Sequence, residues 1–173
     1  MQSKTLILYA SKYGVTRQYA EWLAEAVCGD CLPVSKARPD MLAAYSTVIF
    51  GGGLYASSIS GIAFVIKNAA RCQRLAVFTV GLTDPSLINH AEIVNHNLPP
   101  ELRDTTAVFH LHGGIDYARL SLPHKLILAA AKKLAAKAPN DSPVAMLPEQ
   151  AANFAAKEAL APLIAFAQTH VSG

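Results

Sequence analysis

The sequence contains no long hydrophobic run and no dense cluster of basic residues, and each absence excludes a class of protein. No apolar stretch reaches the roughly 20 residues that span a bilayer, so we expect no transmembrane helix. The apolar segment near the N-terminus is too short for the core of a signal peptide, which makes the cytoplasm the expected compartment. Lysines and arginines do not gather with aromatic residues, and this argues against nucleic acid as a partner.

Cysteine is also scarce, with three in the chain. Cys28 and Cys31 have the C-x-x-C spacing of thioredoxin-like redox sites. They fall at the end of a predicted helix, where the helix dipole destabilises a thiolate, and we expect Gly29 to cap that helix. With Cys72 they still lack the fourth ligand of a zinc site. We therefore expect incidental cysteines and no metal centre.

Hydrophobic residues make up 52% of the 173 residues and charged residues only 16%. This composition supports a full core, and the length fits one domain over residues 1–173. Strand-like and helix-like patterns alternate along it, which indicates an α/β fold with a parallel sheet between two layers of helices. The expected strands lie near residues 4–9, 32–36, 46–51, 75–81 and 106–112. The expected helices lie near residues 15–28, 60–72, 86–96, 122–138 and 148–169, with a kink or restart at Pro162.

A phosphate-binding loop is predicted after the first strand. The apolar run Leu6–Tyr9 stops at small and hydroxyl residues, and a helical pattern begins near Thr16. Free N–H groups at a helix N-terminus favour an anion in such a loop. The loop is neither a Walker motif nor a dinucleotide fingerprint, and a simple capped turn is the alternative. The candidate binding residues are Ser11, Lys12, Tyr13, Gly14, Val15 and Thr16.

The other predicted strands also run into loops that contain glycine. Gly51-Gly52-Gly53 follows the third strand, Gly81 the fourth, and Gly113-Gly114 the fifth. Ligands of open parallel sheets bind at the carboxyl ends of the strands, so these loops are expected to form one site. His110 and His112 share a face of the last strand, and we expect buried, hydrogen-bonded histidines there because further metal ligands are missing.

These features resemble the flavodoxin-like family, and the likeness covers nearly the whole chain. The loop Ser-x-x-Gly-x-Thr from Ser11 to Thr16 is similar to the flavodoxin phosphate loop, although Tyr13 stands where flavodoxins usually have Thr or Asn. The segments around residues 9–16, 51–55, 113–117 and 149–155 resemble the branch of short bacterial flavodoxin-domain proteins and menaquinone-dependent protoporphyrinogen dehydrogenase. The resemblance implies a doubly wound five-stranded sheet of order 2-1-3-4-5 and one non-covalent FMN.

The resemblance also places the flavin ring. Gly52, Gly53, Leu54 and Tyr55 are expected on one side of the ring, and Leu82, Thr83 and Asp84 on the other. Tyr55 is the stacking candidate, with Tyr117 or ordinary packing of Tyr55 as alternatives. Asp84 and Asp116 either contact the ligand or cap a following helix.

The leading hypothesis is an FMN-dependent oxidoreductase or electron-transfer protein, with a redox protein or a quinone as its partner. One alternative is menaquinone-linked oxidation of protoporphyrinogen in heme biosynthesis. Another is a flavodoxin fold that binds no flavin and serves as an interaction domain. The net charge of +3 departs from the acidic charge of most flavodoxin carriers. The lysines of the helix near 122–138 are either solvated or form a docking face for anionic lipid or for an acidic partner.

Overall fold

The computed structural model describes residues 4–115, 117–135, 137 and 152–169. Five parallel strands form its central sheet, in the order β2-β1-β3-β5-β6, which is the predicted 2-1-3-4-5 order of the parallel strands. They are β1 (Thr5–Ala10), β2 (Asp30–Pro33), β3 (Thr47–Tyr55), β5 (Leu75–Gly81) and β6 (Thr106–His112). The short β4 (Ser58–Ile59) pairs antiparallel with the end of β3. The predicted fold class is therefore confirmed.

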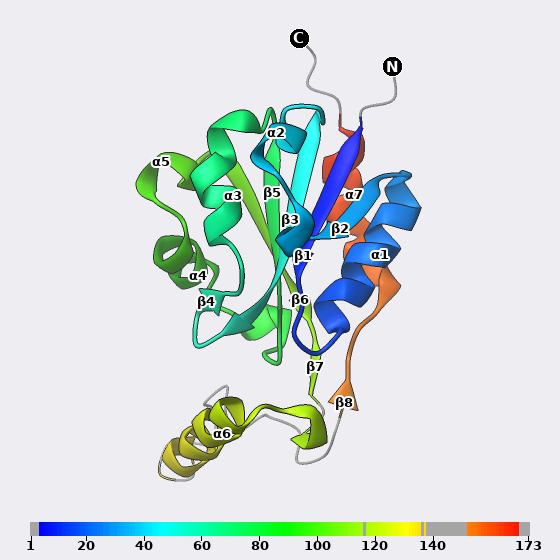
Figure 1. The fold of residues 1–173 in the computed structure, drawn as a ribbon. Coiled ribbons are helices and arrows are strands. Elements are labelled where there is room, and N and C mark those ends of the chain that lie inside the picture. The colour runs from blue at the N-terminus through cyan, green and yellow to red at the C-terminus, as the bar shows by residue number, and fades with distance from the viewer. Residues whose placement is uncertain (1–3, 116, 136, 138–151, 170–173) are drawn as a thin grey trace.

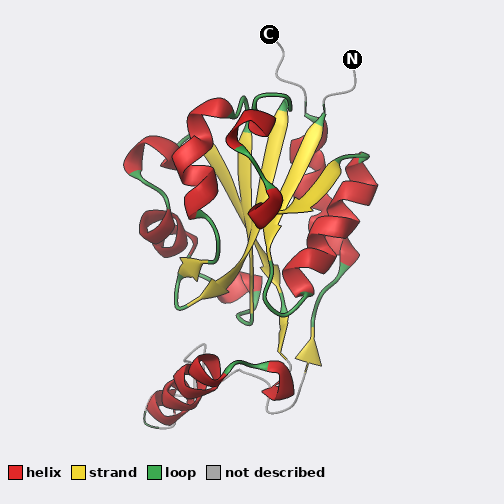
Figure 2. Ribbon diagram, in the orientation of Figure 1, coloured by secondary structure: helices red, strands yellow, loops and turns green. Residues whose placement is uncertain are grey.

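Helices cover both faces of the sheet (Figure 2). One layer contains α1 (Val15–Val27) and α7 (Ala161–Gln168), and the other contains α3 (Ala63–Asn68) and α4 (His90–Asn97). The shorter elements are η1 (Val34–Lys36), α2 (Pro39–Leu42), η2 (Ala69–Arg71), η3 (Pro85–Leu87), α5 (Pro100–Arg103), η4 (Tyr117–Arg119) and η5 (Lys157–Leu160). The remaining helix, α6 (Leu122–Ala135), lies beyond the carboxyl ends of the strands (Figure 1).

Side chains that alternate between the two faces of the sheet form two hydrophobic cores. Ile7, Ile49 and Phe78 pack toward α1 and α7, whereas Leu8 and Phe50 pack in the opposite core. Successive side chains of a strand point to opposite faces, so each central strand contributes to both cores. Because both faces are buried, the central strands read as continuous apolar runs, as parallel strands do.

Two predicted boundaries at the first crossover were wrong. The second strand spans Asp30–Pro33 rather than 32–36, because the turn after α1 is tight. Cys28, and not Gly29, adopts the left-handed conformation that ends α1, with φ of 51°. Gly29 is instead confined by close packing, since a Cβ there would lie 2.8 Å from the Ile7 side chain.

The predicted helix over residues 148–169 was wrong over residues 152–156. Residues 148–151 lie outside the described residues. Ala152–Asn153 forms β8, which pairs antiparallel with β7 (Gly114–Ile115). A helix begins only at Ala161, with Pro162 in its first turn, which confirms the predicted restart. Pairing with a segment distant in the sequence therefore overrides the helix propensity of the alanine-rich tail.

Within the described residues, no helix has the length and apolarity needed to cross a bilayer. The helix predicted near 122–138 is present as Leu122–Ala135, and residues 136 and 138 lie outside the described part of the chain.

Candidate functional site

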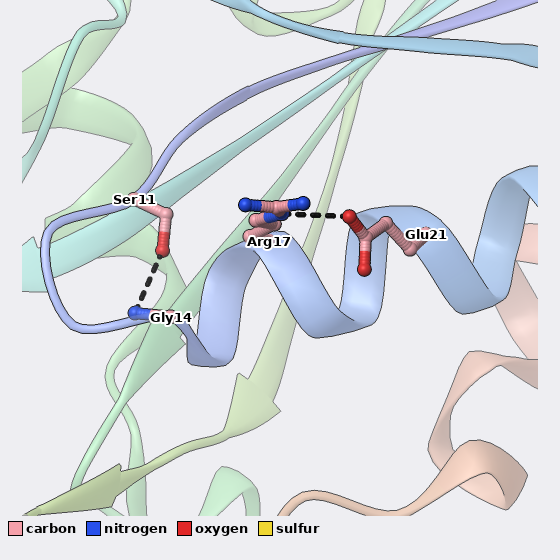
Figure 3. Close-up of polar contacts among 4 residues, drawn as sticks. All are labelled: Ser11, Gly14, Arg17 and Glu21. Atoms are coloured by element: carbon pink, nitrogen blue, oxygen red, sulfur yellow. Dashed lines mark hydrogen bonds and ion pairs between the residues drawn. The ribbon is translucent and has the colours of Figure 1, made fainter.

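The predicted phosphate loop joins β1 to the N-terminus of α1. Gly14 is its left-handed residue, with φ of +97°, a conformation that glycine adopts without strain. The Ser11 hydroxyl oxygen accepts a hydrogen bond from the Gly14 N–H at 3.1 Å (Figure 3). Among the described residues, no side chain caps the N-terminus of α1. Its first N–H groups are therefore available to an anion in the loop.

A cavity of about 90 Å³, which we call the ring-side cavity, lies between this loop and the ends of β3, β5 and β6. It brings together most of the residues that the sequence assigned to the site. Those lining it are Ser11, Lys12, Tyr13, Val15, Thr16, Gly53, Leu54, Tyr55 and Leu82. Gly81, Gly113 and Gly114, from loops that the sequence also singled out, line it too. Val80 and Leu120 complete the lining without having been predicted.

Four predicted residues do not line this cavity. Gly14 lines a neighbouring hollow. Gly52 is buried against the β3–β4 hairpin, where a Cβ would lie 2.6 Å from the Ile59 side chain and from the Ser60 carbonyl oxygen. Thr83 presents its carbonyl oxygen to His110, and Asp84 caps the turn that follows.

The hydrogen bonds of Asp84 match the capping alternative. One carboxylate oxygen accepts from the Ser86 N–H at 2.8 Å and from the Ser86 hydroxyl at 2.5 Å. These bonds hold the pKa of Asp84 below its usual range. Asp84 therefore acts as a cap for η3 in this structure. Asp116, for which the same choice was left open, lies outside the described residues.

Two histidines of β6 hold the loop that follows β5. The His110 ring lies 2.6 Å from the Thr79 hydroxyl through Nδ1 and 3.1 Å from the Thr83 carbonyl oxygen through Nε2. The His112 ring contacts the Leu82 carbonyl oxygen at 3.1 Å. Burial lowers the pKa of His110 to about 4, so this imidazole is neutral at pH 7. As predicted, His110 is buried and hydrogen-bonded. The described residues contain no group of three or more side chains that could hold a metal ion.

Tyr13 connects the phosphate loop to the start of α6. Its hydroxyl accepts from the Ser121 N–H at 3.1 Å and lies 2.6 Å from Nδ1 of His124. Lys12 donates to the Ser121 hydroxyl at 3.2 Å. The His124 ring in turn stacks on Tyr55, with centroids 4.6 Å apart and planes inclined by 18°. Residues 120–124, which we call the strap, therefore cover the ring-side cavity.

The strap is not among the features predicted from the sequence. Ser121 and His124 lie more than 100 residues from Tyr13, and neither belongs to a recognisable motif. The presence of Tyr13 at a position that usually holds Thr or Asn was the one available signal, because a large side chain there needs a partner. Tyr117, the alternative stacking residue, has a side chain outside the described part of the structure.

A larger hollow of about 630 Å³ adjoins the cavity and shares Tyr13, Val15 and Gly114 with it. Arg17 and Arg119 line it, and we call it the arginine hollow. Glu21 also lines it and binds Arg17 across one helical turn at 2.6 Å (Figure 3). Arg119 therefore adds a guanidinium to the wall beside the N-terminus of α1.

Cys28 and Cys31 of the C-x-x-C pair are not joined by a disulfide in this structure. Cys28, Cys31 and Cys72 are all free thiols. Burial raises the pKa of Cys31 to about 11, which disfavours the reactive thiolate.

A family model described as a flavodoxin domain matches residues 6–142. A search of curated proteins found no match to the chain. One similar solved structure is oxidised flavodoxin 1 from Bacillus cereus, with 15% identity over 74% of this chain and 95% of that chain and a TM-score of 0.46. Another is a flavoprotein in complex with FMN from Lactobacillus acidophilus, with 18% identity, coverage of 64% and 92%, and a TM-score of 0.46.

Proposed function

Because the chain belongs to the flavodoxin domain family, we propose that it is a redox protein that binds FMN with its phosphate at Ser11–Thr16. The observation that carries the proposal is the N-terminus of α1. It follows a loop that turns through a left-handed glycine, and no described side chain caps it. The backbone N–H groups and the helix dipole would hold the phosphate, with the Ser11 and Thr16 hydroxyls beside them.

The residues present fit the phosphate, and they fit the flavin ring only after a local rearrangement. The ring-side cavity of about 90 Å³ is well below the roughly 300–1,000 Å³ of ordinary ligand pockets. The strap and Tyr55 cover it, and their contacts are side-chain stacking and hydrogen bonds, which can open without disturbing the sheet. We therefore expect the strap to move when the ring enters between Tyr55 and Leu82.

Bound FMN would supply reversible uptake and release of electrons. The chain's residues would hold it in place and exclude water. His110 and His112 fix the carbonyl oxygens of Thr83 and Leu82, so the loop beside the ring would be rigid. The Gly53 and Gly81 backbone would approach the ring edge closely. A redox protein or a quinone is the proposed electron partner.

A titration of the purified chain with FMN tests the proposal. We expect one-to-one binding with a change in flavin fluorescence, and a matched Gly14→Val variant that binds more weakly because it loses the left-handed turn. An absence of binding at tens of micromolar FMN would contradict it and favour a flavin-free interaction domain.

The arginine hollow favours one specific activity, the menaquinone-linked oxidation of protoporphyrinogen. The volume of this hollow suits a ligand larger than the three-ring flavin. The Arg119 guanidinium could pair with a carboxylate of a tetrapyrrole. Incubation of the FMN-loaded protein with protoporphyrinogen and a menaquinone analogue should then yield porphyrin fluorescence. The Arg119→Gln variant should raise KM more than it lowers kcat. Fluorescence no higher than that of an FMN-only control would exclude this activity.

A further inference from the structure

We propose that the outward face of α6 docks on an anionic lipid bilayer, with the helix lying along the membrane surface. Four large apolar side chains of this helix are exposed to solvent. The exposed fractions are 73% for Leu122, 67% for Leu126, 59% for Ile127 and 72% for Leu134. Exposed apolar side chains gathered on one helix indicate an interaction surface, whereas isolated ones do not.

Contacts on the opposite side of α6 fix which face points outward. His124 is held against Tyr13 and Tyr55, and Leu128 lines an open hollow of about 300 Å³ together with Leu120, Lys125 and Lys132. At 100° per residue, Leu122 and Leu126 lie about 160° from His124 around the helix, whereas Leu134 and Ile127 lie about 80° and 60° from it. Leu122 and Leu126 are therefore turned away from the rest of the molecule, with Leu134 and Ile127 at one edge of that face.

The position of α6 leaves that face accessible to a flat surface. The helix lies beyond the carboxyl edge of the sheet and forms the end of the described structure there (Figure 1). The sheet and the two helical layers lie on the other side of it (Figure 2). A bilayer could therefore meet α6 without contacting the strands.

The positive charge of α6 indicates which kind of partner its exposed face would bind. The helix contains Lys125, Lys132 and Lys133 and no acidic residue, and Lys137 follows it. Lys133 lies seven residues after Leu126 and therefore on the same face, where its long stem can reach the headgroups. A second copy would bring two basic helices together, which like-charge repulsion disfavours. Lysines beside exposed leucines match an anionic bilayer, which attracts each basic residue near its surface.

The proposal does not depend on the flavin, because none of the four exposed apolar residues lines the ring-side cavity. Vesicle sedimentation of the full chain tests it. We expect binding to vesicles of phosphatidylcholine with about one third phosphatidylglycerol, and little binding to phosphatidylcholine alone. Binding should weaken as salt is raised, because salt screens the lysines.

Matched variants locate the surface. Leu126→Gln should weaken vesicle binding at least tenfold, whereas Leu87→Gln, an exposed leucine of η3, should leave it unchanged. Lys133→Gln should weaken it about fivefold, as expected for one lysine near an anionic surface, and Lys67→Gln in α3 should not. Unchanged FMN binding and circular dichroism would show that these variants fold.

Three results would overturn the proposal. One is a wild-type chain that does not bind anionic vesicles at millimolar lipid. Another is an equal loss of binding in the α6 variants and their controls. The third is a lipid-independent dimer that Leu126→Gln abolishes, which would assign the face to a second copy of the chain.

Discussion

The His124 imidazole lies flat against the Tyr55 ring, with centroids 4.6 Å apart, at the mouth of the cavity predicted for the flavin ring. Tyr55 comes from the end of β3 and His124 from the first turn of α6, so the stack joins two segments that a ligand would have to separate. An aromatic pair of this kind contributes roughly 0.5–1.5 kcal/mol beyond its buried area.

The first prediction follows from that stack. We expect His124→Ala to strengthen FMN binding by up to about tenfold, because the variant removes a contact that the ring must displace. Fluorescence titration measures the dissociation constant. Leu134→Ala, an exposed position of the same helix, should leave it unchanged. Weaker binding by His124→Ala would show instead that the imidazole contacts the ligand.

The second prediction tests whether a side chain at Gly14 is disfavoured by backbone strain or by steric clash. A Cβ at Gly14 would meet no atom within 4 Å, so the cost of Gly14→Ala comes from its φ of +97°. We expect a loss of about 1–2 kcal/mol in the free energy of unfolding and weaker FMN binding. Gly14→Asn should lose less, since Asn tolerates left-handed conformations. Urea unfolding and FMN titration measure both effects, and equal losses in the two variants would contradict the backbone explanation.

The third prediction concerns the stability of the fold at acidic pH. The pKa of His110 is about 4 in the folded chain because of burial, against 6.5 for a solvated imidazole. The unfolded chain therefore takes up a proton first as the pH falls. Stability is retained above about pH 6.5 and lost between 6.5 and 4, by roughly 3 kcal/mol from this residue. Urea unfolding at several pH values should show a shallower loss for His110→Gln, and parallel curves would refute the assignment.

The fourth prediction tests a tyrosine that ties three elements together. The buried Tyr19 hydroxyl donates to the His112 carbonyl oxygen at 2.7 Å and accepts from the Ala156 N–H at 3.2 Å. Tyr19→Phe would leave both backbone groups without this partner, and we expect a loss of about 1–3 kcal/mol in unfolding free energy. Thermal and urea unfolding measure it. Tyr45 is partly buried and its hydroxyl binds Asp30 at an exposed position, so Tyr45→Phe supplies a control that should cost less.

The fifth prediction concerns the reduction potential. The chain has a net charge of +3, so it should disfavour negative charge on a reduced flavin less than an acidic flavodoxin does. We expect a less negative midpoint potential than that of an acidic flavodoxin measured in the same buffer. A redox titration that finds equal potentials would contradict the expectation.

The parallel sheet could be predicted because its signals are local. Four of the five parallel strands contain a short apolar run, and glycine or another small residue lies at or directly after the carboxyl end of each. The edge strand β2 (Asp30–Pro33) is the exception. The turn between β1 and α1, which we propose binds phosphate, could be delimited for the same reason, since Ser11, Gly14 and Thr16 lie within six residues. Strands of a parallel sheet are buried on both faces and are therefore nearly continuous apolar runs, which are easy to recognise in a sequence.

The strap and the tail could not be predicted, because both depend on contacts between distant segments. The alanine-rich stretch before Ala161 favours a helix locally, yet Asn153 pairs with Gly114. Phe154 adds a second contact of this kind, since its ring stacks on His112 at 4.3 Å. Similarly, nothing near His124 in the sequence indicates Tyr55. Propensity and spacing describe neighbours along the chain, and these contacts join segments that only the fold brings together.

The pairing of β7 with β8 has a consequence for how this protein could be altered. The chain leaves the core at Ile115 and re-enters it at Ala152, and these two residues are partners in the two-stranded ribbon. The intervening segment is therefore joined covalently to the core at two neighbouring residues, and the contacts of the strap with Tyr13 and Tyr55 are its other attachment among the described residues. Replacing residues 117–150 with a short turn should leave a minimal flavodoxin fold, and grafting that segment onto another such fold should transfer whatever surface it recognises.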